Sequence, residues 1–237
     1  MAYDFDTIAQ AYDRMNHLLT LGLDRCWRKR AVRGLHGNVL DVACGTGDMV
    51  LELAKQGCTV TGVDISEEML EIAKQKTSSA STSPKLGEVD ARRADGGVCL
   101  QLANAEHMPF EDNTFDVVTC AFGVRNFVNL EQGLSEMLRV LKPGGTMVIL
   151  ELAPPDNKLI RPFYNLYTKH IIPWLGSRLA GSREAYTYLP RSIERFPKGN
   201  DFLNIVHHSS LITYHSSHSK LTFGICRMYV INKEVAG

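Results

Sequence analysis

The chain has 237 residues, of which 44% are apolar, enough to bury a substantial core in one α/β domain or in two small ones. We expect a single domain over residues 1–237. Lysine plus arginine and aspartate plus glutamate number 26 each, so the balanced charge offers no long-range attraction for nucleic acid or an anionic membrane. The composition therefore argues against a polyanion-binding protein.

The cysteines and the N-terminus place limits on the compartment. Six cysteines are scattered among apolar neighbours without a CxxC pair, which predicts reduced thiols. The first residues, MAYDFDTIAQAYD, carry acids where a signal peptide needs a basic region, and no window approaches 18 uncharged apolar residues. We expect a soluble, cytoplasmic protein, with peripheral contact to the inner face of a membrane left open.

Short β-branched runs alternate with helical stretches from residue 38 to about residue 152. Parallel neighbouring strands need crossover connections, so this alternation predicts a doubly wound, mostly parallel sheet. Helices are expected after the first strand, over 66–76 and over 130–141. The expected strands are NVLDVA at 38–43, CTVTGVD at 58–64, VCLQLANA at 98–105, FDVVTCAF at 115–122 and GTMVILEL at 145–152.

The remaining segments flank this core at 38–152. Residues 1–37 are expected to form a helical substrate-side segment. Residues 77–97 are too polar to pack and predict a flexible surface insertion. Residues 153–206 show helical spacing broken by prolines and predict a helical excursion over the sheet. In 207–237, KLTFGICRMYVINK predicts a closing strand, paired in an antiparallel hairpin with a segment around 211–214.

The strongest local signal is VLDVACGTGDMV, in which a buried strand leads into Gly45-Thr46-Gly47 and then into a helix. Glycines allow a ligand to approach the backbone, and the helix N-terminus presents unpaired N–H groups. Val50 occupies the place of the third glycine in a dinucleotide fingerprint, which disfavours a pyrophosphate. The motif predicts a nucleotide-like ligand without phosphate. The alternative is a turn that only closes a βα unit.

Asp64 ends the second expected strand in GVDIS, where an acidic side chain can accept both ribose hydroxyls of an adenosyl group. The alternative role is an N-cap of the next helix. Ser66 is a good cap by itself, so we expect Asp64 to be free for the ligand.

Two further motifs follow strands at the same edge of the sheet. Asn104 and Ala105 end the third strand in LANAEHMPF and are expected to contact adenine. Arg125 and Asn126 follow the fourth strand in FGVRNF, where polar groups beside phenylalanines predict a partner. The alternative for Arg125 is a surface salt bridge. In LKPGG, a proline and two glycines are expected to stop a helix and turn the chain into the fifth strand.

Together these motifs resemble those of class I S-adenosylmethionine-dependent methyltransferases, and more narrowly the family that C-methylates the ring of menaquinone and ubiquinone precursors. FDTIAQAYDRMNHLLTLGLDRCWR resembles that family's N-terminal signature, YTYLPRSIERFP its second signature, and LTFGIC its final strand. The resemblance covers nearly the whole chain. It implies a Rossmann-like fold with a seven-stranded, mostly parallel sheet and a C-terminal antiparallel hairpin.

The resemblance also implies the site residues. The cofactor is S-adenosylmethionine, and the ring-side catalytic residues are Tyr12, Arg125 and Asn126. This chain departs from the family at two places: Ala121 stands where many members have Ser, and HHSSLITYHSSHSK replaces an AGF turn. The implied cofactor contacts are Asp41, Gly45, Thr46, Gly47, Asp64, Asn104 and Ala105.

Four of the eight histidines, His207, His208, His215 and His218, lie in that replaced segment. Imidazoles bind zinc, but no carboxylate or thiolate completes a ligand spacing there. The serine-rich surroundings predict a solvated turn, and we expect no metal.

The resemblance implies a reduced polyprenyl hydroquinone as acceptor, either demethylmenaquinol or the ubiquinone-pathway benzoquinol. Loss of a phenolic proton makes the adjacent ring carbon nucleophilic, and Arg125 with Asn126 is expected to hold the oxyanion. The base stays open between Tyr12, Asp64 acting through a water, and solvent. No metal is required.

The isoprenoid tail needs an apolar surface, which LIRPFYNLYTKHIIPWLGSRLA can supply. This stretch is flanked by Lys158, Arg161, Lys169 and Arg178, as in an interfacial helix. A helix packed on its own domain is the alternative, and a homodimer is left open.

Three other functions compete with this interpretation. An NAD-dependent oxidoreductase would need Gly near position 50 and a Tyr-Lys or His arrangement that the sequence lacks. A non-catalytic S-adenosylmethionine-binding subunit would not need the Arg125-Asn126 pair. A methyltransferase for another small molecule, O-methylation included, is the main alternative.

Overall fold

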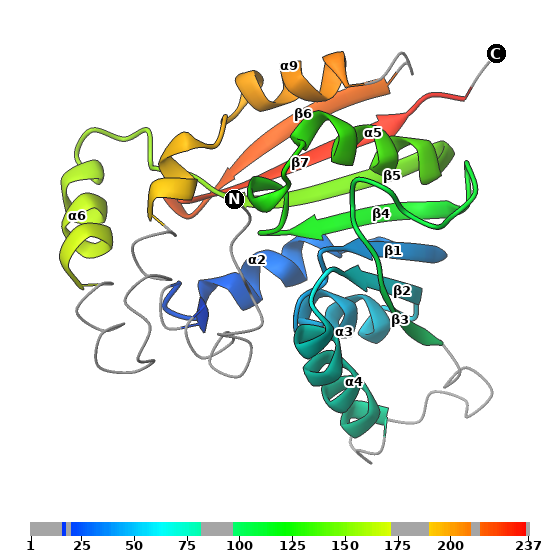
Figure 1. Cartoon of the computed structure of the whole chain (residues 1–237). Helices are drawn as coiled ribbons and strands as arrows, with labels where there is room; N and C mark the ends of the chain where they lie inside the picture. The colour runs from blue at the N-terminus through cyan, green and yellow to red at the C-terminus, as the bar shows by residue number, and fades with distance from the viewer. Residues whose placement is uncertain (1–15, 18–19, 82–96, 172–189, 210–213, 236–237) are drawn as a thin grey trace.

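The computed structural model describes residues 16–17, 20–81, 97–171, 190–209 and 214–235. Within them, seven strands form one sheet in the order β3-β2-β1-β4-β5-β7-β6. Five strands are parallel, and β7 runs antiparallel to both β5 and β6 (Figure 1). The strands are β1 (Asn38–Val42), β2 (Thr59–Asp64), β3 (Val98–Leu102), β4 (Phe115–Ala121), β5 (Leu141–Leu152), β6 (Tyr214–Leu221) and β7 (Cys226–Lys233). The predicted doubly wound, mostly parallel sheet with a C-terminal antiparallel hairpin is confirmed.

Helices cover both faces of the sheet. The parallel strands are therefore buried on both sides. One core contains side chains of α2 (Leu23–Ala31), α3 (Asp48–Lys55) and α4 (Glu67–Ser81). The opposite core contains side chains of α5 (Leu130–Val140) and α9 (Asn200–His208). Neighbouring residues of β1 serve opposite cores, as strand alternation requires, with Val39 in the first and Leu40 in the second.

The insertion predicted from residue 77 begins later, because α4 continues to Ser81. Thr77, Ser78 and Ser79 remain helical by donating their hydroxyls to carbonyls one turn earlier, at 2.7–2.9 Å. Such bonds satisfy the hydroxyl groups within the helix, although they do not by themselves stabilise it. The rest of the predicted insertion, residues 82–96, lies outside the described residues.

The LKPGG segment also differs from its prediction, because it belongs to β5 from Leu141 onward. The register slips between the pairs Phe115–Leu141 and Val117–Thr146, so the segment is an irregular excursion within the strand. A Cβ atom at Gly145 would lie 2.8 Å from the carbonyl oxygen of Asp116. Glycine is required there by close backbone packing.

The C-terminal hairpin is present, but its partner strand was misplaced. The partner is β6 at Tyr214–Leu221, and LTFGIC forms the turn into β7 in place of a final strand. Three successive residues, Thr222, Phe223 and Gly224, have positive φ, which makes the turn tight. The His-rich segment is likewise no solvated turn, because His207 and His208 end α9 while His215 and His218 lie on β6.

The helical excursion begins with α6 (Arg161–Leu166) and the π-helical turn η3 (Tyr167–Ile171). Figure 1 shows α6 beyond the end of the sheet at which β4 finishes, with α9 lying along β6. In the N-terminal segment, α2 packs on the sheet through Trp27 and Ala31.

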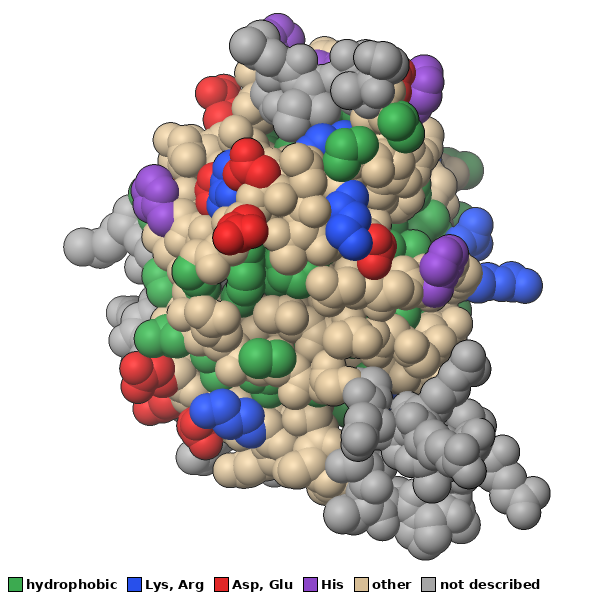
Figure 2. All heavy atoms as spheres, turned by 90° about the vertical axis from the view of Figure 1, so that its right-hand side faces the viewer, with side chains coloured by type: hydrophobic (Ala, Val, Ile, Leu, Met, Phe, Trp, Pro, Cys, Tyr) green, Lys and Arg blue, Asp and Glu red, His purple; other side chains and the backbone are tan. Residues whose placement is uncertain are grey.

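None of the helices among the described residues is long and apolar enough to cross a bilayer. On the face seen in Figure 2, acidic and basic side chains are interspersed, as the balanced composition predicts.

Candidate active site

A cleft of about 820 Å³ lies where β1, β2, β3 and β4 end. Open α/β sheets bind ligands at this edge. The residues of the predicted site that line the cleft are Gly45, Asp64, Asn104, Ala105 and Asn126. Five strand-end predictions thus meet in one cavity.

Asp64 is anchored on both carboxylate oxygens. Oδ2 accepts the Gly45 N–H at 2.8 Å and Oδ1 accepts the Ser66 N–H at 3.0 Å. Ser66 Oγ caps α4 by accepting the Met69 N–H, as expected. The prediction that Asp64 is free was therefore wrong. The backbone holds its carboxylate in place at the cleft wall.

Three predicted cofactor residues do not line the cleft. Thr46 is buried and its hydroxyl accepts from Lys76 Nζ at 3.1 Å. Gly47 has φ of 84° and packs so closely on α4 that an added Cβ would lie 3.0 Å from the Ala73 Cβ. Both residues shape the glycine turn from behind.

Asp41 is the third, a carboxylate buried within β1. Thr119 Oγ1 donates to its Oδ1 at 2.6 Å, and Oδ2 has no hydrogen-bond partner among the described residues. Burial raises the pKa of Asp41 to about 7, and the nearby Asp64 carboxylate adds to this, against the opposing effects of Thr119 and Arg28. The core next to the cleft therefore holds an acid that titrates near neutral pH.

The loop after β3 contains a residue that the sequence analysis missed. Glu106 lines the cleft, and its Oε1 accepts the Val128 and Asn129 N–H groups at 2.7 and 3.0 Å. Asn104 Oδ1 accepts the Glu106 N–H at 2.9 Å, which fixes the turn. Glu106 thus ties the loops after β3 and β4 together. No motif pointed to it, because its partners are backbone groups 22 and 23 residues away.

The loop after β4 contains η2 (Val124–Asn126), where the two predicted ring-side residues separate. Asn126 lines the cleft. The Arg125 side chain is only 6% exposed and pairs with Glu151 of β5 at 2.7 Å, while also donating to the Phe122 carbonyl at 2.6 Å. The alternative prediction, a salt bridge, is thus confirmed, but the pair is buried and not on the surface. Glu151 was not predicted.

Tyr164 of α6 is partly buried and lies near enough to Arg125 for its charge to act on the phenol. Burial raises its pKa to about 12, the Glu194 carboxylate adds to this, and the Arg125 charge opposes it. Sequence periodicity gave no signal for Tyr164, since aromatic residues fill the whole segment. Tyr12, the third predicted catalytic residue, lies outside the described residues.

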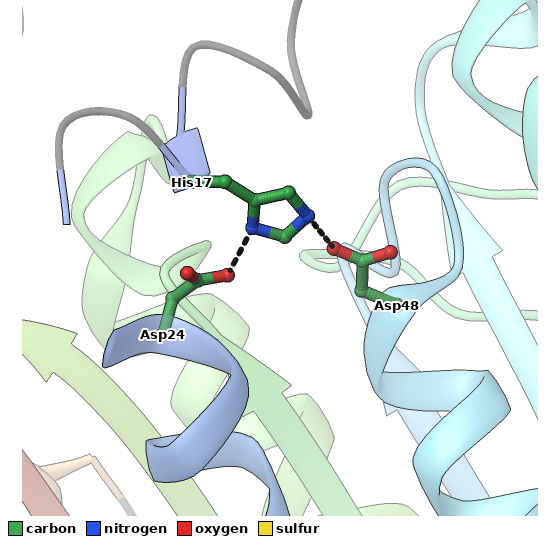
Figure 3. Close-up of side chains that lie close together, drawn as sticks. All are labelled: His17, Asp24 and Asp48. Carbon is green, nitrogen blue, oxygen red and sulfur yellow. Dashed lines mark hydrogen bonds and ion pairs between the residues drawn. The ribbon is translucent and has the colours of Figure 1, made fainter. Parts of the chain in front are cut away.

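A second polar group joins the N-terminal segment to the glycine turn (Figure 3). His17 lies between two acids, with Nδ1 at 2.8 Å from Asp24 Oδ2 and Nε2 at 3.8 Å from Asp48 Oδ2. Asp48 begins α3 immediately after Gly47. This group fastens residues before α2 to the start of α3.

Histidine and aspartate side chains can bind metals, so His17, Asp24 and Asp48 could form a metal site. Whether they do depends on the charges that already face the two carboxylates. Arg28 pairs with Asp24 at 2.5 Å, and Lys76 pairs with Asp48 at 2.8 Å. Burial opposes ionisation of Asp24, but Thr20, Arg28 and His17 outweigh it and lower its pKa. With both carboxylates already neutralised, the arrangement is a hydrogen-bonded latch. It gives no support to a metal centre.

The cleft fits an adenosyl group. Asp64 presents an oriented carboxylate beside apolar walls from Ile65, Met69 and Phe127, a combination that suits a ribose and a flat adenine ring. The sheet order, with its antiparallel β7 between β5 and β6, is the fold of class I S-adenosylmethionine-dependent methyltransferases.

Comparison of the sequence with known families narrows the class. Residues 2–233 match the ubiE/COQ5 methyltransferase family, and the chain belongs to that family. It is 41% identical to a demethylmenaquinone methyltransferase from Bacteroides fragilis, over 97% of this chain and 90% of that protein. A ubiquinone/menaquinone biosynthesis C-methyltransferase from Geobacter sulfurreducens is also 41% identical, over 97% and 86% of the two chains.

Solved structures support the fold alone. An S-adenosylmethionine-dependent methyltransferase from Thermotoga maritima, described as a possible histamine N-methyltransferase, superposes with a TM-score of 0.65 at 18% identity, over 97% of this chain and 98% of that one. A methyltransferase from Methanococcus maripaludis gives 0.64 at 19% identity, over 100% and 97%.

Proposed function

We propose that this enzyme transfers the methyl group of S-adenosylmethionine to a ring carbon of a reduced polyprenyl quinone precursor, with demethylmenaquinol as the first substrate to test. The names of relatives at 41% identity support this choice. The ubiquinone-pathway benzoquinol is the second substrate, because that name covers both pathways. The observation that carries the proposal is one cleft lined by both Asp64 and Asn126, with Arg125 beside it.

The residues divide into a cofactor side and a ring side. On the cofactor side, Asp64 accepts the ribose hydroxyls, and the Asn104–Ala105 turn faces the adenine. Gly45 lets the backbone approach the ligand, while Asp41, Thr46 and Gly47 act from behind the turn. On the ring side, Asn126 donates to the acceptor oxygen. Arg125, held by Glu151, supplies positive charge where the phenolate develops.

The chemistry requires an electron-rich ring. S-adenosylmethionine supplies an electrophilic methyl group on a sulfonium. A phenolic proton leaves, the ring carbon attacks the methyl group, and the carbon–sulfur bond breaks towards sulfur. The ring carbon then loses its proton, and the phenolate oxygen takes one up, so that one proton is released overall. Tyr12, an Asp64-bound water and solvent are the candidates to take the phenolic proton. No step of this sequence calls for a metal.

The acceptor also bears on where the enzyme works. A polyprenyl quinol partitions into the bilayer, so we propose that the chain acts as one unit from the cytoplasmic side, in peripheral contact with the membrane. The balanced charge supports a small-molecule partner over nucleic acid.

The test is anaerobic turnover of a short-chain demethylnaphthoquinone with labelled S-adenosylmethionine, with and without a chemical reductant. Only the reduced acceptor should gain label, because the quinone ring is electron-poor at carbon. Chromatography of the product shows where the label resides. Equal methylation of the oxidised acceptor would refute the phenolate route. Label on oxygen would make the protein an O-methyltransferase.

A further inference from the structure

A row of exposed apolar side chains lies on α6 and on the turn that leads into it. Leu159, Phe163 and Leu166 are 80%, 74% and 55% exposed. Phe163 and Leu166 are three residues apart and lie on one side of α6, and Leu159 lies in the preceding turn. Soluble proteins seldom leave such a row uncovered without a binding role.

A further exposed apolar side chain lies at the β6–β7 tip. Phe223 is 72% exposed, although its neighbours in the tip are held firmly. Thr222 Oγ1 accepts from Trp27 Nε1 at 2.9 Å, and a Cβ atom at Gly224 would lie 4.0 Å from Pro155, in the segment that leads into α6. Figure 1 shows α6 and this tip at the same end of the molecule. We name Leu159, Phe163, Leu166 and Phe223 the docking surface.

Positive charge surrounds the docking surface. Lys158 and Arg161 are exposed beside the row. Beneath the tip, Asp156 pairs with three cations, and their hydrogen bonds, Lys220 first, hold its pKa well below its usual range. Three cations on one carboxylate leave a local excess of positive charge. The three partners of Asp156 are Lys198, Lys220 and Arg227.

We propose that this surface docks the enzyme on a bilayer that contains anionic phospholipid. Exposed leucine and phenylalanine insert at the boundary of headgroups and acyl chains, and flanking lysine and arginine attract anionic headgroups. A protein partner or a second copy of the chain would bury the apolar row equally well. The cations around it favour an anionic lipid surface.

The inner face of the same helix explains why docking serves the reaction. Tyr164 is about 100° around the helix from Phe163, by the 3.6-residue period, and lies close enough to Arg125 to feel its charge. One helix therefore presents the exposed row on one side and the partly buried Tyr164, near Arg125, on another. This step rests on the proposed function, because it needs an acceptor with an apolar tail.

The experiment is co-sedimentation of the purified full chain with phosphatidylcholine vesicles, with and without phosphatidylglycerol. The Phe163→Ser/Phe223→Ser variant should bind anionic vesicles at least about tenfold more weakly than wild type, as the loss of two buried aromatics predicts. The matched control is Val235→Ser, another side chain that is 71% exposed but lies near the C-terminus. It should bind like wild type.

Charge reversal tests whether the basic side chains attract anionic headgroups. Lys158→Glu/Arg161→Glu should abolish the preference for phosphatidylglycerol, whereas Lys74→Glu on α4, 54% exposed, should keep it. Equal binding of wild type to both vesicle types, or no binding, overturns the proposal. So does a concentration-dependent dimer that the Phe163→Ser/Phe223→Ser variant loses.

Turnover separates this proposal from the proposed function. The Phe163→Ser/Phe223→Ser variant should methylate a short-chain quinol in solution at the wild-type rate, and a long-chain quinol in vesicles at least about tenfold more slowly. Inactivity of wild type on the short-chain quinol would refute the proposed function, yet vesicle binding would still be measured. Equal loss on both acceptors would refute docking as the cause.

Discussion

At the residue scale, Asp64 combines two tasks that the sequence presents as alternatives. Its carboxylate accepts the Gly45 and Ser66 N–H groups, and it also lines the cleft. The structural bonds fix the position of the carboxylate at the cleft wall. A position at the end of a strand was predictable from the run of buried residues before it. The Gly45 bond was not, because it joins two motifs 19 residues apart.

Asp64→Ala should weaken S-adenosylmethionine binding by roughly 1–3 kcal/mol, the cost of leaving hydrogen-bonding groups unpaired. Asp64→Asn keeps one acceptor and should lose less. Isothermal titration measures both, with thermal melts to detect any loss of the fold. Unchanged affinity in Asp64→Ala would remove this residue from the site.

Arg125 and Glu151 form a buried pair, so a single substitution confounds chemistry with folding. Arg125→Leu leaves Glu151 uncompensated and should destabilise the protein by about 3–5 kcal/mol, whereas Arg125→Leu/Glu151→Leu should regain most of that loss. Turnover in the double variant should still be about 10²–10³ lower if Arg125 stabilises the phenolate. Recovery of both turnover and stability would show a purely structural pair.

Asp41 predicts a pH dependence of stability. Its pKa is raised by burial from 3.8 to about 7, so the folded state binds a proton that the unfolded state has released in that window. The stabilisation is complete below pH 3.8 and is lost as the pH rises through about 7. The total is about 4 kcal/mol, at about 1.4 kcal/mol for each pKa unit.

Denaturant melts at several pH values check this prediction, with Asp41→Asn as the reference. Wild type should lose stability relative to Asp41→Asn between about pH 5 and 8. A constant difference between the two proteins would show that Asp41 is ionised throughout that range.

At the scale of elements, the predictable parts are those with an apolar pattern. The strands β1, β2 and β4 carry runs of buried residues, and each was placed within a residue or two. The edge strand β6 has no such pattern, because YHSSHSKL buries only its first and last residues. Its backbone pairing with β7 makes it a strand, and a serine-rich sequence without alternation gives no sign of that pairing.

The site follows the same division. Residues at strand ends were predicted because parallel strands bring their carboxyl ends together, as at Asp64 and Asn126. Glu106, Glu151 and the latch of His17, Asp24 and Asp48 were missed. Each depends on a partner from another element, and sequence spacing carries no information about such contacts.

The contact between α3 and α4 behind the glycine turn gives a prediction at this scale. Gly47 and Gly57 both have positive φ, so alanine costs about 1–2 kcal/mol at either position. Only at Gly47 would the new Cβ press on a neighbour, at 3.0 Å from Ala73. Gly47→Ala should therefore lower the melting temperature more than Gly57→Ala and weaken cofactor binding. Equal losses in both variants would show that the contact relaxes freely.

At the scale of the whole molecule, neutrality conceals an uneven distribution of charge. Acids and bases total 26 each and are interspersed on the face in Figure 2. Near the docking surface, by contrast, three cations pair with the one carboxylate of Asp156. The cofactor cleft lies at the same end of the sheet but is walled mainly by apolar and uncharged groups. Membrane attraction and cofactor binding should then respond differently to salt.

Salt should separate the two because screening acts on exposed charges at a distance. The Debye length falls from about 10 Å at 0.1 M to about 3 Å at 1 M ionic strength, so anionic vesicle binding should fall at least about tenfold over that range. S-adenosylmethionine binding and short-chain turnover should change less than about twofold, because the polar contacts in the cleft are short.

Titrations in sodium chloride measure vesicle binding, cofactor binding and turnover. Some vesicle binding should survive in 1 M salt, since burial of apolar surface is not screened, and the Phe163→Ser/Phe223→Ser variant should lose that remainder. Vesicle binding that ignores salt would leave the cations around Asp156 without a role in docking.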